Sequence, residues 1–250
     1  MNELEDTLMQ AEAAIKQRDG APAFFDLDDF PWTQALQAQW PALRAEADAV
    51  LSALHLLPGI EELQPEQLDL SDDRRWKIFP LFAYGNWARN NLRRCPATAE
   101  AILGMPGLQA AMFSVLEPRK VLPAHRGVYG GMLRYHMGIR VPQPASQCGI
   151  TVGGQTRHWE EGRSLIFDDS HEHEAWNHSD EPRVILLADF TRPVAPDLRD
   201  MNDQIILALR SDDYVVKAVE RWDAWEALHG SRFDAALEAA RDRTSISTDN

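Results

Sequence analysis

Apolar residues recur at helical spacing in the first part of the chain. The first such set, three or four positions apart, is Leu4, Leu8, Ala11 and Ile15. This spacing predicts a helix that ends near Gly20. A second helical pattern covers residues 32–57, and Pro41 should divide it by standing in the first turn of the longer piece. The apolar stripe of this second stretch is Leu36, Trp40, Leu43, Ala47, Leu51 and Leu54.

The pattern changes between about Lys77 and Pro193. Runs of β-branched and aromatic residues alternate there with turns rich in Gly, Pro and Asp, which is typical of an all-β barrel or sandwich. The strands expected are Ala111–Leu116, Met132–Val141, Gly149–Val152, Thr156–Trp159, Ser164–Phe167 and Arg183–Phe190. One helix is expected near Ala97–Leu103. The chain is therefore predicted to be mainly β with flanking helices.

Helical patterns return after Pro193. One short stripe is Ile205, Ile206 and Leu209, and a second is Val215, Val219 and Trp222, with Ser211 and Asp212 placed to cap its start. The polar residues 244–250 should be frayed. We expect a helical segment at 1–73, a β core at 74–195 and C-terminal helices at 196–250, packed as one compact unit. The stretch 58–73, rich in Pro, Glu and Asp, is the candidate boundary.

Composition and charge limit the classes of partner that the protein is expected to bind. The net charge of −14 disfavours nucleic acid and anionic membranes, because both select for basic surfaces. No run approaches the roughly 20 apolar residues of a membrane span, and the acidic start lacks the features of a secretory signal. We therefore expect neither a nucleic-acid partner nor a membrane partner. Only two cysteines occur, far apart, so we expect a cytoplasmic protein without disulfides. The oligomeric state is not predicted.

Polar residues on the expected strands suggest a cavity that is lined by polar side chains. Alternation places Arg134 and His136 on one face of the strand that starts at Met132, opposite an apolar face. Arg183 stands at the mouth of an apolar strand, where it could clamp an anion or simply end the strand at the surface. These residues become informative only in combination.

A segment rich in acids and imidazoles follows the strand expected at Ser164–Phe167. In this segment His171 and His173 share one face if the chain is extended. Imidazole and carboxylate suit borderline metals, yet a solvated acidic turn explains the composition equally well. The chain contains no nucleophile elbow, phosphate-binding glycine loop or His-Glu-x-x-His helix, so the chemistries of those motifs are disfavoured.

The ordered set of motifs between Ser114 and Pro193 resembles the aspartyl/asparaginyl β-hydroxylase family of Fe(II)/2-oxoglutarate dioxygenases. The matching stretches are Pro123-Ala124-His125-Arg126-Gly127, Leu133-Arg134-Tyr135-His136-Met137-Gly138, Trp159-Glu160-Glu161-Gly162, Phe167-Asp168-Asp169-Ser170, His173-Glu174-Ala175-Trp176 and Arg183. Each stretch alone is weak, whereas their order and spacing together are specific. They cover about a third of the chain, and the helical flanks carry no comparable signal.

The resemblance implies a fold and a set of site residues. The family's fold is a double-stranded β-helix, a cupin-like jelly-roll barrel that holds iron inside. By resemblance, His125 and His173 bind Fe(II), while Gly127 stands where most such oxygenases have a third, carboxylate ligand. Arg183 and Ser114 would hold the distal carboxylate of 2-oxoglutarate. The remaining predicted contacts are Arg134 and His136 near its chelating end, with the division between co-substrate and substrate open, and Trp87 in the same pocket.

The expected activity is hydroxylation of an sp3 carbon, with O2 as oxidant and succinate and CO2 as co-products. The substrate is expected to be a small molecule or peptide bearing an aspartyl or asparaginyl-like unit, hydroxylated at its β-carbon. The missing membrane segment counts against a lipid substrate. The alternatives are a non-catalytic metal-binding cupin-like sensor, which has no need for Arg134 and Arg183, and a dioxygenase whose product is not an alcohol.

Overall fold

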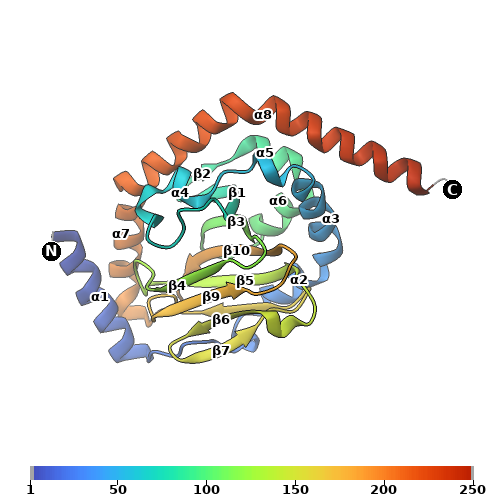
Figure 1. Cartoon of the computed structure of the whole chain (residues 1–250). Helices are drawn as coiled ribbons and strands as arrows, with labels where there is room; N and C mark the ends of the chain where they lie inside the picture. The colour runs from blue at the N-terminus through green and yellow to red at the C-terminus, as the bar shows by residue number, and fades with distance from the viewer. Residues whose placement is uncertain (1–2, 249–250) are drawn as a thin grey trace.

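Two antiparallel sheets form the centre of the protein in the computed structural model, which describes residues 3–248, with side chains for 6–240. The six-stranded sheet has the order β2-β1-β3-β10-β5-β8, and the four-stranded sheet has the order β4-β9-β6-β7 (Figure 1). The strands are β1 Trp76–Ala83, β2 Asn86–Trp87, β3 Leu108–Leu116, β4 Val121–His125, β5 Met132–Arg140, β6 Cys148–Val152, β7 Gln155–His158, β8 Ser164–Phe167, β9 His173–Asn177 and β10 Arg183–Thr191. The core is a double-stranded β-helix, as predicted.

Apolar side chains from both sheets fill the space between them. This inner cluster includes Ile78 and Ile185 of the larger sheet and Ile150 and Ala175 of the smaller one. Because successive side chains of a strand point to opposite faces, the residues between these apolar positions point away from the interior. The interior is therefore a second core, separate from the one beneath the helices.

Helices cover the outer face of the larger sheet (Figure 1). The helices are α1 Glu3–Asp19, α2 Trp32–Ala38, α3 Trp40–Leu51, α4 Ile60–Leu63, α5 Arg89–Arg94, α6 Pro96–Leu103, α7 Arg199–Leu209 and α8 Asp213–Thr248, with a 3-10 turn η3 at Pro65–Gln67. Leu43 of α3 and Phe233 of α8 pack there with Phe79, Phe113 and Tyr135 of the sheet. Helices α1 and α7 form a third cluster around Tyr129.

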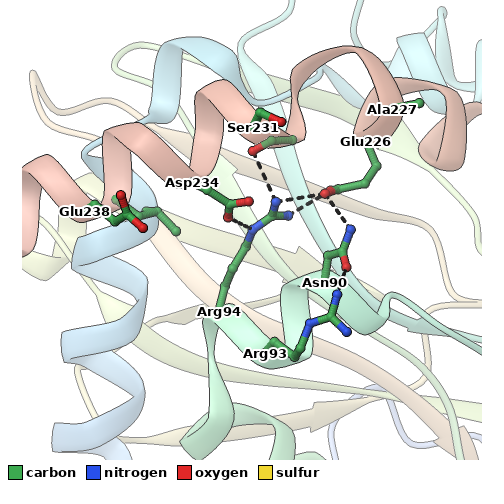
Figure 2. Close-up of a pocket in the computed structure, with 10 residues that line it drawn as sticks. Asn90, Arg93, Arg94, Glu226, Ala227, Ser231, Asp234 and Glu238 are labelled. Carbon is green, nitrogen blue, oxygen red and sulfur yellow. Dashed lines mark hydrogen bonds and ion pairs between the residues drawn. The ribbon is translucent and has the colours of Figure 1, made fainter.

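A buried arginine of α5 forms ion pairs with the long helix α8 (Figure 2). The guanidinium of Arg94 makes two hydrogen bonds of 2.8 Å to the carboxylate of Glu226, and its Nε donates to Asp234 at 2.7 Å. The Arg94 side chain is only 6% exposed. The first helical turns of α8 form part of the wall of the pocket described below, so this ion pair supports that wall.

We expect Arg94→Ala to lower the free energy of unfolding by about 2–3 kcal/mol, because it leaves the Glu226 carboxylate without its charged partner in a largely buried place. Urea denaturation measures this loss. Arg93→Ala is the matched control, since Arg93 is exposed one position away, and it should cost less than about 0.5 kcal/mol. Equal effects of the two substitutions would contradict the role of the ion pair.

Most predicted elements are confirmed within a few residues. Pro41 stands in the first turn of α3 as expected, and the Asp212 side chain accepts a hydrogen bond from the Tyr214 amide at the start of α8. Helix α8 continues to Thr248, so the frayed end predicted from residue 244 is wrong as far as the structure describes it, and residues 249–250 lie outside the described part. Strong helix formers such as Ala and Arg favour the helix as far as Arg243, and residues 244–248 continue it.

Four strands and two helices were not predicted: β1, β2, β4, β9, α4 and α5, and α4 lies in the stretch 58–73 that was expected to be a boundary. Two of these strands contain proline, which disfavours the prediction of a strand. Pro80 stands at a register shift of β1, and Pro123 lies in β4, which is an edge strand, and both are places where a sheet tolerates proline. None of the described helices is long and apolar enough to cross a bilayer.

Candidate functional site

Two histidines meet where β4 ends and β9 begins. The strands pair so that His125 lies opposite His173, and their ring centroids are 4.1 Å apart. Each Nδ1 lies within hydrogen-bond distance of a backbone carbonyl, at 2.8 Å from Pro123 for His125 and at 2.9 Å from His171 for His173. These contacts favour the tautomer with the proton on Nδ1, which leaves both Nε2 lone pairs free to bind a metal.

Burial keeps both rings neutral. It is the largest cause of the lowered pKa of His125, and it lowers the pKa of His173 to about 3, with a further contribution from the neighbouring His125. A neutral imidazole is the form that binds a metal ion. The pair is therefore suited to hold a divalent cation at neutral pH.

A buried arginine lies inside the barrel at the start of β10. Arg183 is only 2% exposed, and its guanidinium lies over the Trp159 ring at 4.5 Å. Its Nε and Nη1 atoms have no hydrogen-bond partner among the described residues. Burial lowers its pKa to about 9, which means that nothing nearby compensates its charge well. A buried cation in this state fits a carboxylate that arrives with a ligand.

Two further polar side chains face the interior from the strands beside β10. Ser114 of β3 lies opposite Ile185, and His136 of β5 lies opposite Leu187. The Ser114 hydroxyl accepts a 3.0 Å hydrogen bond from the Trp76 indole, so its own proton remains available to an acceptor. Three strands therefore contribute Ser114, His136 and Arg183 to one place.

The hydrogen bonding of His136 defines its tautomer. The Trp159 indole donates to its Nδ1 at 3.3 Å, so the ring proton is on Nε2, which has no partner among the described residues. Burial, followed by the charges of Arg134 and Arg183, holds the pKa of His136 well below its usual value. The ring thus offers one unused N–H donor. Trp159, to which the sequence assigned no role, contacts both His136 and Arg183.

Unlike Arg183, Arg134 already has carboxylate partners. Its guanidinium binds Asp189 through two hydrogen bonds of 2.7 and 3.0 Å, and it lies 3.0 Å from an Asp169 oxygen. The predicted contact of Arg134 with 2-oxoglutarate would have to compete with these two carboxylates. Sequence reasoning missed both aspartates: Asp169 belongs to the acidic segment that a solvated turn explained equally well, and Asp189 belongs to a strand in which it was assigned no role.

A separate pocket of about 700 Å³ opens beside the histidine pair. Its lining includes His125 and Arg134, whereas Ser114, His136 and Arg183 lie outside it. Its apolar wall comes from α4, β1, β3 and α8, with Ile60, Ile78, Met112, Val219 and Trp222. Trp87, predicted to line the site, lies at the edge of this pocket, 36% exposed and packed on Phe82 at 4.2 Å. His125 therefore borders the apolar pocket, and the buried Arg183 lies outside that pocket.

A model of the aspartyl/asparaginyl β-hydroxylase family matches residues 37–193. The chain belongs to this family. The ornithine lipid ester-linked acyl 2-hydroxylase of Rhizobium tropici is 40% identical over 224 residues, which are 90% of this chain and 78% of that protein. Human aspartyl/asparaginyl β-hydroxylase is 29% identical over 165 residues, which are 64% of this chain but only 21% of the human protein.

One solved structure illustrates a distant likeness to this chain. The cupin domain of an XRE-family transcriptional regulator from Enterobacter cloacae aligns with a TM-score of 0.34 and 13% identity, over 48% of this chain and 99% of that one. This likeness is too low to bear on function.

The space beside the histidines that a third ligand would need is occupied. The Gly127 amide donates to the Asp169 carbonyl at 2.7 Å, and a Cβ on Gly127 would lie 2.2 Å from the Asp169 carboxylate. Among the described residues, no three His, Cys, Asp or Glu side chains are placed to bind one metal ion. A glycine here leaves room for a carboxylate that comes from a different part of the chain.

We expect Gly127→Asp to weaken iron binding and to lower the free energy of unfolding by about 1–3 kcal/mol, because the new side chain collides with Asp169 before it can reach a metal. Calorimetric iron titration and thermal unfolding measure the two effects. Gly127→Asp combined with Asp169→Gly removes the collision and should recover stability. Tighter iron binding by the single variant at unchanged stability would contradict this account.

Proposed function

We propose that this family member is a non-haem Fe(II) and 2-oxoglutarate dependent hydroxylase, with iron held by His125 and His173. The observation that carries the proposal is the buried guanidinium of Arg183, which has unpaired donors a short way inside the barrel. Arg183 and Ser114 would hold the distal carboxylate of 2-oxoglutarate. His136 would donate its free Nε2–H to another oxygen of the same molecule.

The loaded iron site would supply the oxidation, in which one atom of O2 enters a substrate C–H bond and the other enters succinate as 2-oxoglutarate loses CO2. The residues of the chain itself would bind the iron and 2-oxoglutarate and fix their orientation. The two Nδ1 contacts fix the ring planes of His125 and His173. Apolar side chains between the sheets exclude bulk water from the Arg183 site, which strengthens its interaction with a carboxylate.

We further propose that the substrate is an acyl chain, as in the name of the Rhizobium tropici relative, rather than the aspartyl unit expected from the sequence. The pocket beside His125 is lined by five acids, Glu66, Asp69, Asp169, Asp189 and Asp223, and by two arginines, Arg126 and Arg134. Arg134 is already bound to carboxylates, and Arg126 is exposed. This excess of acids disfavours a substrate carboxylate, while the apolar wall favours an aliphatic chain.

Anaerobic Fe(II) titration with and without 2-oxoglutarate tests the activity, followed through the weak iron-to-ketoacid charge-transfer band. The band should form in the wild type and disappear in His125→Ala and in His173→Ala. His158→Ala is the matched control, because His158 lies on the exposed strand β7, and it should keep the band. If iron binds but no band forms, the protein is the metal-binding sensor instead.

A matched pair of substrates separates the two substrate classes. We expect a lipid-linked acyl chain to gain one oxygen atom and to increase succinate formation, and an aspartyl peptide to do neither. Mass spectrometry of both products measures the outcome. Oxygen gain by the peptide alone would return the substrate to the aspartyl class.

A further inference from the structure

Four exposed apolar side chains belong to segments that line the apolar pocket. These four come from segments distant in the sequence: Leu68 after η3, Trp87 of β2, Val128 between β4 and β5, and Val216 of α8. They are 53%, 36%, 65% and 41% exposed. Trp87 and Val128 line the pocket directly, and Leu68 and Val216 each lie next in the sequence to a lining residue. We call these four residues the apolar rim.

The rim differs from ordinary surface apolar residues in its arrangement. The other large apolar side chains that are exposed in the described part of the chain are Met9, Leu103, Val121, Leu207 and Leu228. They are distributed over α1, α6, β4, α7 and α8. Isolated exposed apolar residues are common and need no explanation, whereas a set grouped on the segments that line one pocket marks a binding surface.

Continuity with the pocket indicates what the rim binds. Apolar side chains such as Leu63, Leu70 and Met112 share the pocket lining with His125. An acyl chain that leaves a bilayer through the rim could enter this pocket without crossing water, which spares the cost of exposing its methylene groups. This step depends on the proposed function, because it assumes that the chain oxidised at His125 belongs to a lipid.

Charge at the same mouth selects the kind of lipid surface. Glu66, Asp69 and Asp223 belong to the pocket lining, and Asp69 and Asp223 are exposed. The net charge of the whole chain is −14. An anionic bilayer would repel such a face, whereas zwitterionic or amine-bearing headgroups would tolerate or attract it. The earlier expectation of no membrane partner used net charge and the lack of a spanning segment, and neither property describes this local apolar surface.

We propose that the apolar rim docks the protein on the surface of a bilayer with zwitterionic or amine-bearing headgroups, and that the acyl substrate enters the pocket there. Docking of this kind is shallow and reversible, because only a few side chains enter the boundary between headgroups and acyl chains.

Vesicle flotation tests the docking with iron-free protein and no 2-oxoglutarate. Wild type should float with phosphatidylcholine vesicles and more strongly when a lipid with a free amine is added. Added phosphatidylglycerol should weaken flotation at low salt, and the difference should shrink near about 1 M salt, where screening acts over roughly 3 Å. Absence of flotation with every composition would overturn the proposal.

The rim itself is tested with a pair of double variants. Leu68→Ser with Val216→Ser removes two rim residues that do not line the pocket, and the partition coefficient should fall about tenfold. Leu103→Ser with Leu228→Ser makes the same change at exposed sites elsewhere, and its partition coefficient should stay within about twofold of wild type. Equal losses in the two variants would show that the rim has no special role.

Trp87 reports insertion directly, since the other seven tryptophans are buried or partly buried. Lipids with brominated acyl chains should quench its fluorescence, and Trp87→Phe should lose that quenching. Sedimentation velocity tests whether a second copy of this chain occupies the rim instead of a bilayer. If Leu68→Ser with Val216→Ser changes the oligomeric state, the face joins two copies and the proposal fails. The charge-transfer band should be unchanged in both double variants, so a missing band in wild type would count against the iron chemistry alone.

Discussion

Replacing Arg183 with Met is expected to weaken 2-oxoglutarate binding strongly and yet leave the iron-free protein at least as stable as wild type. The guanidinium is buried, its Nε and Nη1 have no partner among the described residues, and burial lowers its pKa to about 9. Removing a buried charge that lacks a compensating partner should change the free energy of unfolding by an amount between zero and a gain of about 4 kcal/mol. Loss of the Trp159 contact offsets part of that gain.

The affinity of Arg183→Met for 2-oxoglutarate should fall, although its stability is maintained. A bidentate pair between guanidinium and carboxylate has no equivalent in Met, so the affinity for 2-oxoglutarate should fall by about 100-fold or more. Calorimetric titration of the Fe(II)-loaded protein and urea denaturation of the iron-free protein measure the two quantities. Arg183→Lys keeps the charge and should recover only part of the affinity. A large loss of stability in Arg183→Met would show that the cation already has a structural partner.

Arg134→Met should have the opposite effect on stability, with a loss of about 3 kcal/mol. Arg134 bridges Asp169 and Asp189, whose side chains are only 9% and 13% exposed, and its removal leaves two carboxylates close together and uncompensated. The same type of substitution in the same barrel therefore changes stability in opposite directions at Arg183 and Arg134. The main difference is that Arg134 has two carboxylate partners, whereas Nε and Nη1 of Arg183 have no partner among the described residues.

The loss should depend on pH. Burial is the largest cause of the raised pKa of Asp169, and the charge of Arg134 opposes that rise. In Arg134→Met the pKa should rise further. A carboxyl whose pKa is higher in the folded than in the unfolded protein binds more protons when folded, so stability falls as pH rises above about 4, the unfolded value. Urea denaturation of iron-free protein between pH 5 and 8 should therefore show a steeper decline for the variant than for wild type.

Arg140→Met provides the matched control for this experiment. Arg140 ends the same strand, its side chain is 36% exposed, and its bonds to Asp48 and Glu181 are surface ion pairs. Its removal should cost less than about 1 kcal/mol and should not alter the pH dependence. An equal cost at Arg134 and Arg140 would contradict the assignment of Arg134 to a buried cluster.

Periodicity alone determined much of the fold. The alternation from Met132 to Ile139 set one apolar face and one polar face of β5, and the structure confirms both. It also fixed the helical flanks and most strands of the barrel, because each pattern depends only on residues within one element. The sites at His125, His173 and Arg183 could be nominated from motif order, and the comparisons confirm the family that those motifs indicated.

Short strands with polar or proline-containing sequences escaped that reasoning. Strand β9 begins with His173 and ends with Asn177, and both residues are buried although they are polar. Its five residues resemble a solvated turn until the neighbouring strands β4 and β6 are present. The burial that makes β9 a strand is supplied entirely by segments distant in the sequence.

The sequence by itself determined the β core, the helical cover and the nominated histidines and arginines. Only the tertiary structure decided which groups meet them: Arg134 is bound to Asp169 and Asp189, whereas Arg183 keeps unpaired donors over Trp159. Strand register and barrel closure bring these groups together from positions far apart in the chain, and no local pattern encodes a distance across two sheets. The same closure places the Asp169 carboxylate against Gly127, where the sequence shows only an absent side chain.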